Sequence, residues 1–326
     1  MDARAWRSLA IWSFLLSAAI VARLVAGRGT DAWGWPDDAD ILDLRVARVA
    51  AGVVVGSALA LAGVLLQCLL RNPLASPDLL GLSTGAGLGV SLAMFLAYRA
   101  TGRIESGAGL ELPALIGASL ALAVVFAISH RRGGLDPGTL ILVGVIVAII
   151  CGAGIRLIQH LLPDQGVAAS RWLMGALRDD QPARRILLAG GLTLAATIAG
   201  AWLGPAMDAA SLSEDEARSL GVPLGGLRAG LFIASGVLAS LAVVIAGPIG
   251  FVGLVGPHAA RLVGGPAHRG LVIGAAIAGA ALVVGADTLV RVIETPTGRI
   301  PIGVITALIG GPLFIALLLN GRRASA

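Results

Sequence analysis

Lysine is absent from the 326-residue chain, and this absence excludes one large class of enzymes. A phosphate-binding loop of the Walker type needs a lysine followed by Ser or Thr, because the lysine reaches the terminal phosphates of the nucleotide. The chain therefore cannot hydrolyse ATP through such a loop. Any ATP-driven role requires a second subunit.

Charge and cysteine are also scarce. Charged residues make up 13% of the chain and hydrophobic residues 57%, whereas typical soluble domains are about 25% charged. The two cysteines, Cys68 and Cys151, lie in or beside apolar runs, so we expect small core residues and no disulfide. The formal charge of +5 comes from scattered arginines, which does not indicate nucleic acid as a partner. The composition predicts a polytopic, all-α membrane protein with a single domain over residues 1–326 and lipid around it.

Patterns typical of metal sites and active sites are missing from the sequence. The four histidines are dispersed and lack a spacing such as HExxH. The predicted spans contain no paired acids, no Ser–Lys pair and no series of buried carboxylates, which ion-driven carriers often have. We therefore predict no catalytic residue, no metal site and no cofactor bound by this chain.

Ten apolar segments are separated by polar turns and resemble membrane spans in length. The expected segments are residues 10–25, 46–66, 82–97, 112–129, 139–157, 186–202, 229–246, 246–265, 271–292 and 302–319. Pro248 and Pro257 predict that the eighth segment is short or interrupted. Gly52 and Gly56 have the small-xxx-small spacing of close helix contacts. Arginines near both ends of the chain place both termini in the cytoplasm by the positive-inside rule.

The region between the fifth and sixth segments is expected on the external side of the membrane. Its stretch SRWLMGAL, residues 170–177, is predicted to lie at the membrane surface as a short amphipathic piece. Arg184 and Arg185 follow on the same side, where the positive-inside rule disfavours them.

A polar island, SLSEDEARSLGVPLGGLR at residues 211–228, interrupts the apolar chain on the cytoplasmic side. Ser213 followed by Glu216 is a capping box, in which each side chain satisfies a backbone donor of the first turn. Gly221 suits the left-handed residue that ends a helix, and Pro223 cannot continue it. The pattern predicts a capped helix of about two turns.

The residues of this island leave two interpretations open. Ala217 and Leu220 are three apart and are expected to share one helix face. The helix is then either a solvated connector or a docking helix for a soluble partner.

Few charged residues lie close to the predicted lipid phase. Asp287 and Arg291 are four apart, so we expect either an ion pair along one helix face or a role at the outer mouth. Arg45 and Arg48 stand at the outer end of the second segment, where they fit either snorkelling anchors or a functional role.

Five motifs in combination resemble the permease subunits of type II ABC importers, the family that takes up ferric siderophores, haem and cobalamin. The motifs are LRVARVAAGVVVGSALALAGVLLQCLLRNPLASPDLLGLSTGAGLG (44–89), RWLMGAL (171–177), SEDEARSLGVP (213–223), AGPIGFVGLVGPHAARL (246–262) and RIPIGVITALIGGPLF (299–314). Gly256 departs from the family, which usually has Val or Ile before the Pro-His pair.

The resemblance implies an architecture and a set of partners. The expected fold is ten transmembrane helices per subunit, in a homodimer around a central path in the bacterial inner membrane. Two ATPase subunits, which bind ATP and Mg²⁺, would contact the cytoplasmic face. A periplasmic or lipid-anchored binding protein would deliver the substrate outside.

The resemblance also assigns roles to residues of this chain. The coupling loop, at about residues 204–228, would meet the ATPase through Ser213, Glu214, Glu216, Ala217, Arg218, Leu220 and Gly221. The cytoplasmic gate would lie at Pro137, Gly138 and Thr139. Arg45, Arg48 and Arg291 would meet carboxylates of the binding protein. Within the coupling loop, we expect Leu220 and Ala217 to pack on the ATPase and Arg218 to make a charged contact.

Two functions are therefore weighed. The first is an importer permease that moves an iron complex, such as a siderophore or haem, or cobalamin, from periplasm to cytoplasm by alternating access. The alternative is a secondary carrier or channel, which would transport without ATP when it is the only protein present. The low aromatic content of 4% suits a bulky cargo but does not choose among these substrates or an oxyanion.

Overall fold

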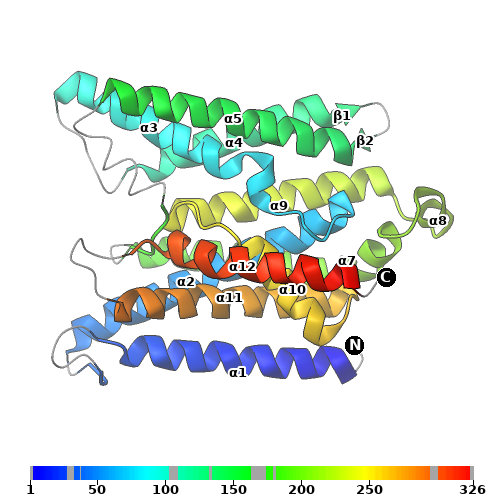
Figure 1. The fold of residues 1–326 in the computed structure, drawn as a ribbon, viewed down its shortest axis with the longest axis horizontal. Coiled ribbons are helices and arrows are strands. Elements are labelled where there is room, and N and C mark those ends of the chain that lie inside the picture. Colours follow the sequence, from blue (N-terminus) through cyan, green and yellow to red (C-terminus); the bar gives the residue numbers. More distant parts are fainter. Residues whose placement is uncertain are drawn as a thin grey trace.

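The computed structural model describes residues 3–27, 33–36, 38–102, 109–131, 134–162, 174–178, 181–293 and 300–323. Within these ranges the chain is almost entirely helical, with one small antiparallel strand pair (Figure 1). The elements are α1 (Ala3–Val25), α2 (Ala39–Leu70), η1 (Pro77–Leu80), α3 (Leu82–Thr101), α4 (Glu111–Ser129), β1 (His130–Arg131), β2 (Gly134–Leu135), α5 (Pro137–Leu161), α7 (Ala183–Ala210), α8 (Glu214–Ser219), α9 (Leu224–Ala246), α10 (Val252–Gly264), α11 (His268–Val292) and α12 (Ile302–Arg323).

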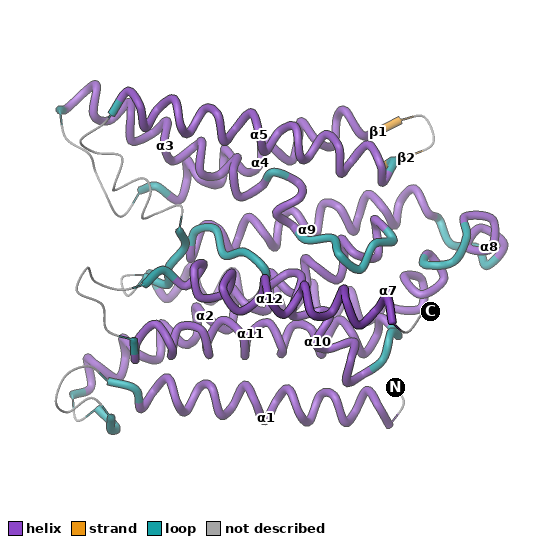
Figure 2. The backbone as a smooth tube through the Cα atoms, in the orientation of Figure 1, coloured by secondary structure: helices purple, strands orange, loops and turns teal. Residues whose placement is uncertain are grey.

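The helix count agrees with the prediction. The described ranges contain ten helices of 13 residues or more. Seven of these, α1, α2, α4, α5, α7, α9 and α11, are long and apolar enough to cross a membrane. α10 has 13 residues, as its prolines predict, and it begins within the bundle after the non-helical stretch 247–251 (Figure 2).

Several helices extend beyond their predicted ends. α7 continues past the expected end at Trp202 to Ala210, with Pro205 inside it. α9 begins at Leu224, before the expected start at Ala229. A proline removes only one backbone hydrogen bond from a helix interior, and backbone hydrogen bonds continue where an apolar run stops. The helices therefore extend beyond the hydrophobic segments, and the polar loop that contains α8 is shorter than predicted.

Both termini, α8 and the β1–β2 pair lie at the same end of the bundle (Figure 1). The positive-inside rule makes this end cytoplasmic, because the arginines at both chain termini are found there. We call it the cytoplasmic end and the opposite one the outer end. The C-terminal ends of α1, α3 and α11 lie at the outer end.

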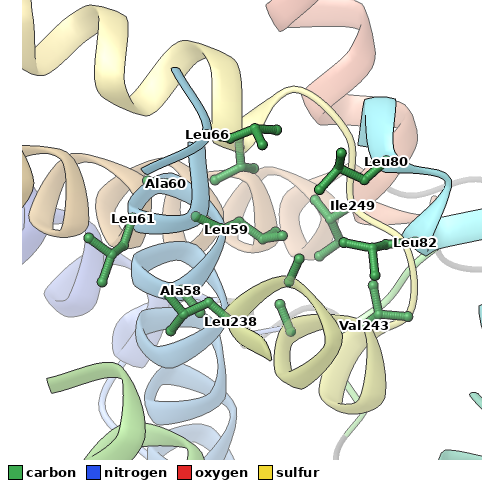
Figure 3. Close-up of a cluster of buried hydrophobic side chains, with 14 of the residues drawn as sticks. Ala58, Leu59, Ala60, Leu61, Leu66, Leu80, Leu82, Leu238, Val243 and Ile249 are labelled. Atoms are coloured by element: carbon green, nitrogen blue, oxygen red, sulfur yellow. The ribbon is translucent and has the colours of Figure 1, made fainter. Parts of the chain in front are cut away.

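α2 is the most deeply buried of the long helices and forms the centre of the core. Figure 3 shows its side chains meeting those of η1, α3, α9 and the stretch before α10. The residues labelled there are Ala58, Leu59, Ala60, Leu61, Leu66, Leu80, Leu82, Leu238, Val243 and Ile249. A Cβ at Gly56 would overlap the carbonyl oxygen of Gly279 in α11, and one at Gly63 would overlap that of Gly253 in α10. Gly56 thus brings α2 to backbone contact with α11, as its spacing predicts, and Gly63 does so with α10, whereas Gly52 faces the side chains of Leu177 and Val284.

The stretch predicted to lie at the membrane surface as an amphipathic piece is only partly described. Residues 170–173 lie outside the described ranges. Residues 174–178 are non-helical, and Leu177 is buried in the core. The amide of Ala176 donates to the carbonyl of Ala246 at 2.7 Å, and Gly175 accepts from the amide of Ile302 at 3.1 Å. This segment therefore joins the end of α9 to the start of α12 through Gly175 and Ala176, while Met174 and Ala176 are exposed.

The arginine that opposed the positive-inside rule has an acidic partner. Arg185, in the first turn of α7, donates to Glu111 at the start of α4 with an Nη1–Oε1 distance of 2.9 Å. Arg178 approaches the same carboxylate oxygen at 3.5 Å. The pairing offsets the positive charge at the outer end and ties α7 to α4.

Candidate functional site

The first turn of α8 is closed by its own side chains. The Ser213 hydroxyl accepts the amide hydrogen of Glu216 at 3.3 Å, and the Glu216 carboxylate accepts the amide hydrogen of Ser213 at 3.0 Å. The predicted capping box is confirmed. The Ser213 hydrogen bonds also hold the pKa of the Glu216 carboxyl below its usual value, so Glu216 is ionised near neutral pH.

The last turn of α8 is closed by a Schellman motif. Gly221 adopts the left-handed conformation with φ of 78°. The amide of Val222 donates to the carbonyl of Ala217 at 3.1 Å, and the amide of Gly221 donates to that of Arg218 at 2.9 Å. These two bonds satisfy carbonyls that a helix end otherwise leaves without partners. α8 has only six residues, yet it is fixed at both ends.

The two apolar residues of this segment, which were expected to share a helix face, differ in burial. Ala217 is fully buried against Ala210 and Leu224, with Val222 beside them. Leu220 is 63% exposed. The burial of Ala217 within this chain corrects the expectation that it packs on the ATPase. Ala217 therefore supports α8 from beneath, and Leu220 is available to a partner.

Glu214 joins α8 to the following long helix. Its carboxylate accepts from Arg228 of α9 at 2.6 Å and from Arg218 of α8 at 3.3 Å. The hydrogen bond from Arg228 and the charge of its guanidinium hold the pKa of the Glu214 carboxyl below its usual value. Arg228 is largely buried, with 12% of its side chain exposed, whereas Arg218 is 63% exposed. The Glu214–Arg228 bond, which joins α8 to α9, is therefore shorter and less exposed than the Glu214–Arg218 pair within α8.

A cavity of about 360 Å³ separates α7 from α9. It is lined almost entirely by apolar and small residues, among them Gly200 and Ala206 of α7 and Gly226 and Gly230 of α9. Val222 and Pro223, which connect α8 to α9, also line it. The two helices that flank α8 in sequence are thus incompletely packed against each other next to it.

The predicted gate residues form the first turn of α5. Asp136 is the N-cap, and its carboxylate accepts from the amide of Thr139 at 2.7 Å and from the Thr139 hydroxyl at 2.5 Å. Pro137 occupies the first turn, where a missing amide hydrogen has no cost. Asp136 is a residue that the sequence interpretation missed, although an acid before Pro-Gly-Thr is a recognisable N-cap signal. The turn into α5 is therefore rigidly capped at the cytoplasmic end.

The outer end contains a buried ionic group that joins three helices. Asp287 of α11 accepts from Arg23 of α1 at 2.5 Å and from Arg48 of α2 at 2.8 Å. The side chains of these residues are 4%, 5% and 2% exposed for Arg23, Arg48 and Asp287. Among the described residues, Asp287 bonds across helices and not to Arg291 along its own helix, which corrects that expectation. Arg23 was overlooked in the sequence because it lies within an apolar run.

The three arginines predicted to dock a binding protein are therefore not equivalent. Arg48 is buried on Asp287. Arg45 is partly exposed, and its guanidinium donates to the carbonyl of Leu24 and, at 3.2 Å, to that of Gly34. Arg291 is partly exposed in the last turn of α11. Accessibility favours Arg45 and Arg291 over Arg48 as contacts for a partner outside.

Across the described ranges, no group of three or more His, Cys, Asp or Glu side chains is arranged to hold a metal ion. Cys68 and Cys151 are buried and unbonded to each other. The features with functional potential are thus the capped helix α8, the capped turn into α5 and the outer arginines.

Comparison with known proteins gives a consistent result. Residues 5–320 match the FecCD transport family. The chain is 37% identical over 282 residues to the hemin transport system permease protein HmuU of Yersinia pestis, covering 86% of this chain and 83% of that one. It is 36% identical to the vitamin B12 import system permease protein BtuC of Citrobacter koseri, covering 97% and 95%. A solved inward-facing structure of a metal-chelate type ABC transporter superposes with a TM-score of 0.83 and 29% identity, covering 97% and 99%.

Proposed function

Because this chain belongs to the FecCD transport family, we propose that it is the permease subunit of a bacterial importer that carries a metal chelate across the inner membrane. The similar proteins are permeases for hemin and vitamin B12, and the similar structure is that of a metal-chelate type transporter. Their cargoes share one chemical class, a large organic ligand around a metal ion. We propose this class for the present chain, with haem, ferric siderophores and cobalamin as the candidates.

The proposed assembly is a homodimer with two ATPase subunits on the cytoplasmic end and a binding protein on the outer end. The chain lacks lysine, so ATP and Mg²⁺ would be bound by the ATPase subunits and not by this chain. The binding protein would meet Arg45 and Arg291, whose side chains are more accessible than that of Arg48, the third arginine predicted to dock it.

One observation carries the proposal that α8 couples transport to ATP hydrolysis. α8 is short and capped at both ends, and it presents Leu220 outward at the end that holds both termini. A mechanical link must be stiff, because a mobile loop would absorb displacement without passing it on. Displacement of α8 would reach α9 through the Glu214–Arg228 bond and through Ala217, which is buried against Leu224.

The gate proposal rests on the turn into α5. Pro137, Gly138 and Thr139 lie at the cytoplasmic end, where a path through the membrane would open inward. The Asp136 cap binds the amide and the hydroxyl of Thr139 and so stabilises this turn. We propose that α5 moves as a rigid helix when the gate opens, so that the turn does not unfold.

The test is reconstitution of the permease with its ATPase subunits and binding protein in proteoliposomes. Uptake of haemin, cyanocobalamin and a ferric siderophore would be measured with and without ATP. Leu220→Asp is expected to abolish ATP-driven uptake, because it places a charge on the exposed contact without disturbing the buried face. Leu220→Met is the matched control and should retain uptake. Normal uptake by Leu220→Asp would remove the coupling role, and ion-driven uptake by the permease without ATPase subunits would overturn the importer assignment.

A further inference from the structure

A second polar site lies at the cytoplasmic end, next to the loop that contains α8. It is a cavity of about 450 Å³ between the end of α2, the end of α7, α10 and the start of α11. Its polar lining is formed by Gln67, Arg71, Asn72, Asp208, Arg261 and His268. None of these side chains is among those named above for coupling, gating or docking, although Asp208 lies within the expected coupling loop at about residues 204–228.

Arg261 of α10 is held in place by a buried amide. Its Nη2 donates to the side-chain oxygen of Gln67 at 2.9 Å, and the Gln67 amide nitrogen donates to the carbonyl of Ala75 at 3.3 Å. Gln67 is 4% exposed. Within the described part of the chain, the other N–H groups of Arg261 have no protein acceptor. The guanidinium is therefore positioned but not saturated.

Arg71 supplies a second guanidinium of the same kind. It terminates α2 in the left-handed conformation, with φ of 48°. Its Nε donates to the carbonyl of Ala210 at 3.0 Å, which leaves both terminal nitrogens without an acceptor among the described residues. The adjacent Asn72 accepts from the amide of Leu74 through its side-chain oxygen, so its NH₂ group is also uncommitted.

Asp208 is the carboxylate in the described lining of the cavity, and one of its two oxygens is engaged. An oxygen of Asp208 accepts the backbone amide hydrogen of His268 at 2.9 Å and lies 2.7 Å from the Nδ1 of the same residue. This pairing closes one of the first amides of α11, whose N-terminus carries partial positive charge. The uncommitted hydrogen-bonding groups of the cavity are consequently mostly donors, on two cationic side chains and one amide.

We propose that this cavity binds the phosphate of an anionic phospholipid from the cytoplasmic leaflet. Guanidinium groups present paired N–H donors that match phosphate oxygens. The cavity lies where four helices end, which is the level of the lipid headgroups at that face, and basic pockets between helices on the cytoplasmic side bind such headgroups. This assignment is independent of whether the protein transports a metal chelate.

The experiment uses the purified full-length protein. Binding of phosphatidylglycerol and of phosphatidylcholine would be measured by native mass spectrometry, for the wild-type protein, Arg71→Gln, Arg261→Gln and Arg7→Gln. Arg7 is exposed at the cytoplasmic end of α1 and outside the cavity, so it is the matched control for charge. Each cavity variant is expected to weaken phosphatidylglycerol binding about tenfold, because each loses a charge-assisted hydrogen bond. Arg7→Gln should not.

Further measurements separate the possible sources of the anion. Thermal stabilisation of the wild-type protein should be larger with phosphatidylglycerol than with phosphatidylcholine or inorganic phosphate. Equal stabilisation by inorganic phosphate would assign the cavity to a soluble anion and overturn the lipid proposal. Equal phosphatidylglycerol binding by all four proteins would also overturn it, as would unchanged lipid binding with lost ATPase association in the cavity variants. Arg261→Lys keeps the charge, so intermediate binding by this variant shows that any loss in Arg261→Gln is not a folding defect.

Discussion

The guanidinium of Arg48 binds the carboxylate of Asp287 across the interface between α2 and α11. Its Nε lies 3.0 Å from both carboxylate oxygens, and its Nη2 lies 2.8 Å from one of them. Arg23 of α1 donates to the Oδ2 atom of the same carboxylate. Asp287 is therefore the counter-ion of two buried guanidiniums. Removing the acid leaves two unpaired charges, whereas removing one arginine leaves an ion pair.

This asymmetry predicts a ranking of variants. Asp287→Asn leaves two buried guanidiniums without a counter-ion and is expected to lower stability by about 3–5 kcal/mol. Arg48→Gln leaves a one-to-one pair of Arg23 and Asp287 and is expected to lower it less. Thermal unfolding of the purified variants measures the ranking, with Arg7→Gln as an exposed control. A larger loss in Arg48→Gln than in Asp287→Asn would show that the carboxylate is not the centre of this group.

The two arginines bonded to Glu214 predict different effects on coupling. Arg228→Gln breaks the largely buried bond from α8 to α9, so we expect less uptake per ATP hydrolysed in the reconstituted transporter. Arg218→Gln removes an exposed pair within α8, worth about 0.3–0.5 kcal/mol, and should leave this ratio nearly unchanged. The double variant Glu214→Arg and Arg228→Glu, which swaps the two charges, should restore part of the uptake per ATP hydrolysed. Equal behaviour of the two glutamine variants would separate α9 from the coupling path.

The acidity of Glu214 offers a direct test of the same bond. Its pKa is lowered from the ordinary value of 4.5, mainly by the hydrogen bond from Arg228. A lowered pKa means that the ionised form contributes to stability above pH 4.5 and that this contribution is lost as pH falls through the lower value. Carbon-13 NMR of labelled glutamate side chains should show the Glu214 midpoint rising towards 4.5 in Arg228→Gln. An unchanged midpoint would show that Arg228 does not bond to Glu214 in solution.

Helix contacts made through glycine predict a strong dependence on position. Gly56→Ala introduces a Cβ that overlaps the backbone of α11, so the helices must separate, at an expected cost of about 1–3 kcal/mol. Gly191→Ala, on an exposed face of α7, meets no atom within 4 Å. It is expected to be neutral or to stabilise the helix by about 0.5–1 kcal/mol. The melting temperatures of the two variants and of the wild-type protein, measured in the same detergent, test this difference.

Features that depend on neighbouring residues were predictable from the sequence. The capping box of Ser213 and Glu216, the left-handed Gly221 and the short α10 follow from local backbone chemistry. The contacts of Gly56 also followed, because small residues four apart have one main use inside a membrane. The number of long helices followed from the apolar segments.

Features that depend on tertiary partners were not predictable. Arg23 and Asp287 are separated by 264 residues, and no local pattern relates them, so the sequence favoured the nearby Arg291. Ala217 was expected to pack on a partner, whereas Ala210 and Leu224 of the flanking helices cover it, and no local pattern relates these residues. The ends of α7 and α9 were predicted too close to the membrane centre. The prediction used the start of polar sequence, which marks the edge of the lipid, whereas helical backbone hydrogen bonds continue beyond that edge.

The unequal packing of the bundle has a mechanical consequence. α2 packs on α10 and α11 by backbone contact at glycines. We therefore expect these three helices to move together as one rigid block. α7 and α9 enclose a cavity, and the loop that contains α8 joins them there. A load applied to α8 is therefore taken up first as a change in spacing between α7 and α9, and the block moves afterwards as a unit. Spin-label distances between α7 and α9 should change with nucleotide state more than those between α2 and α11.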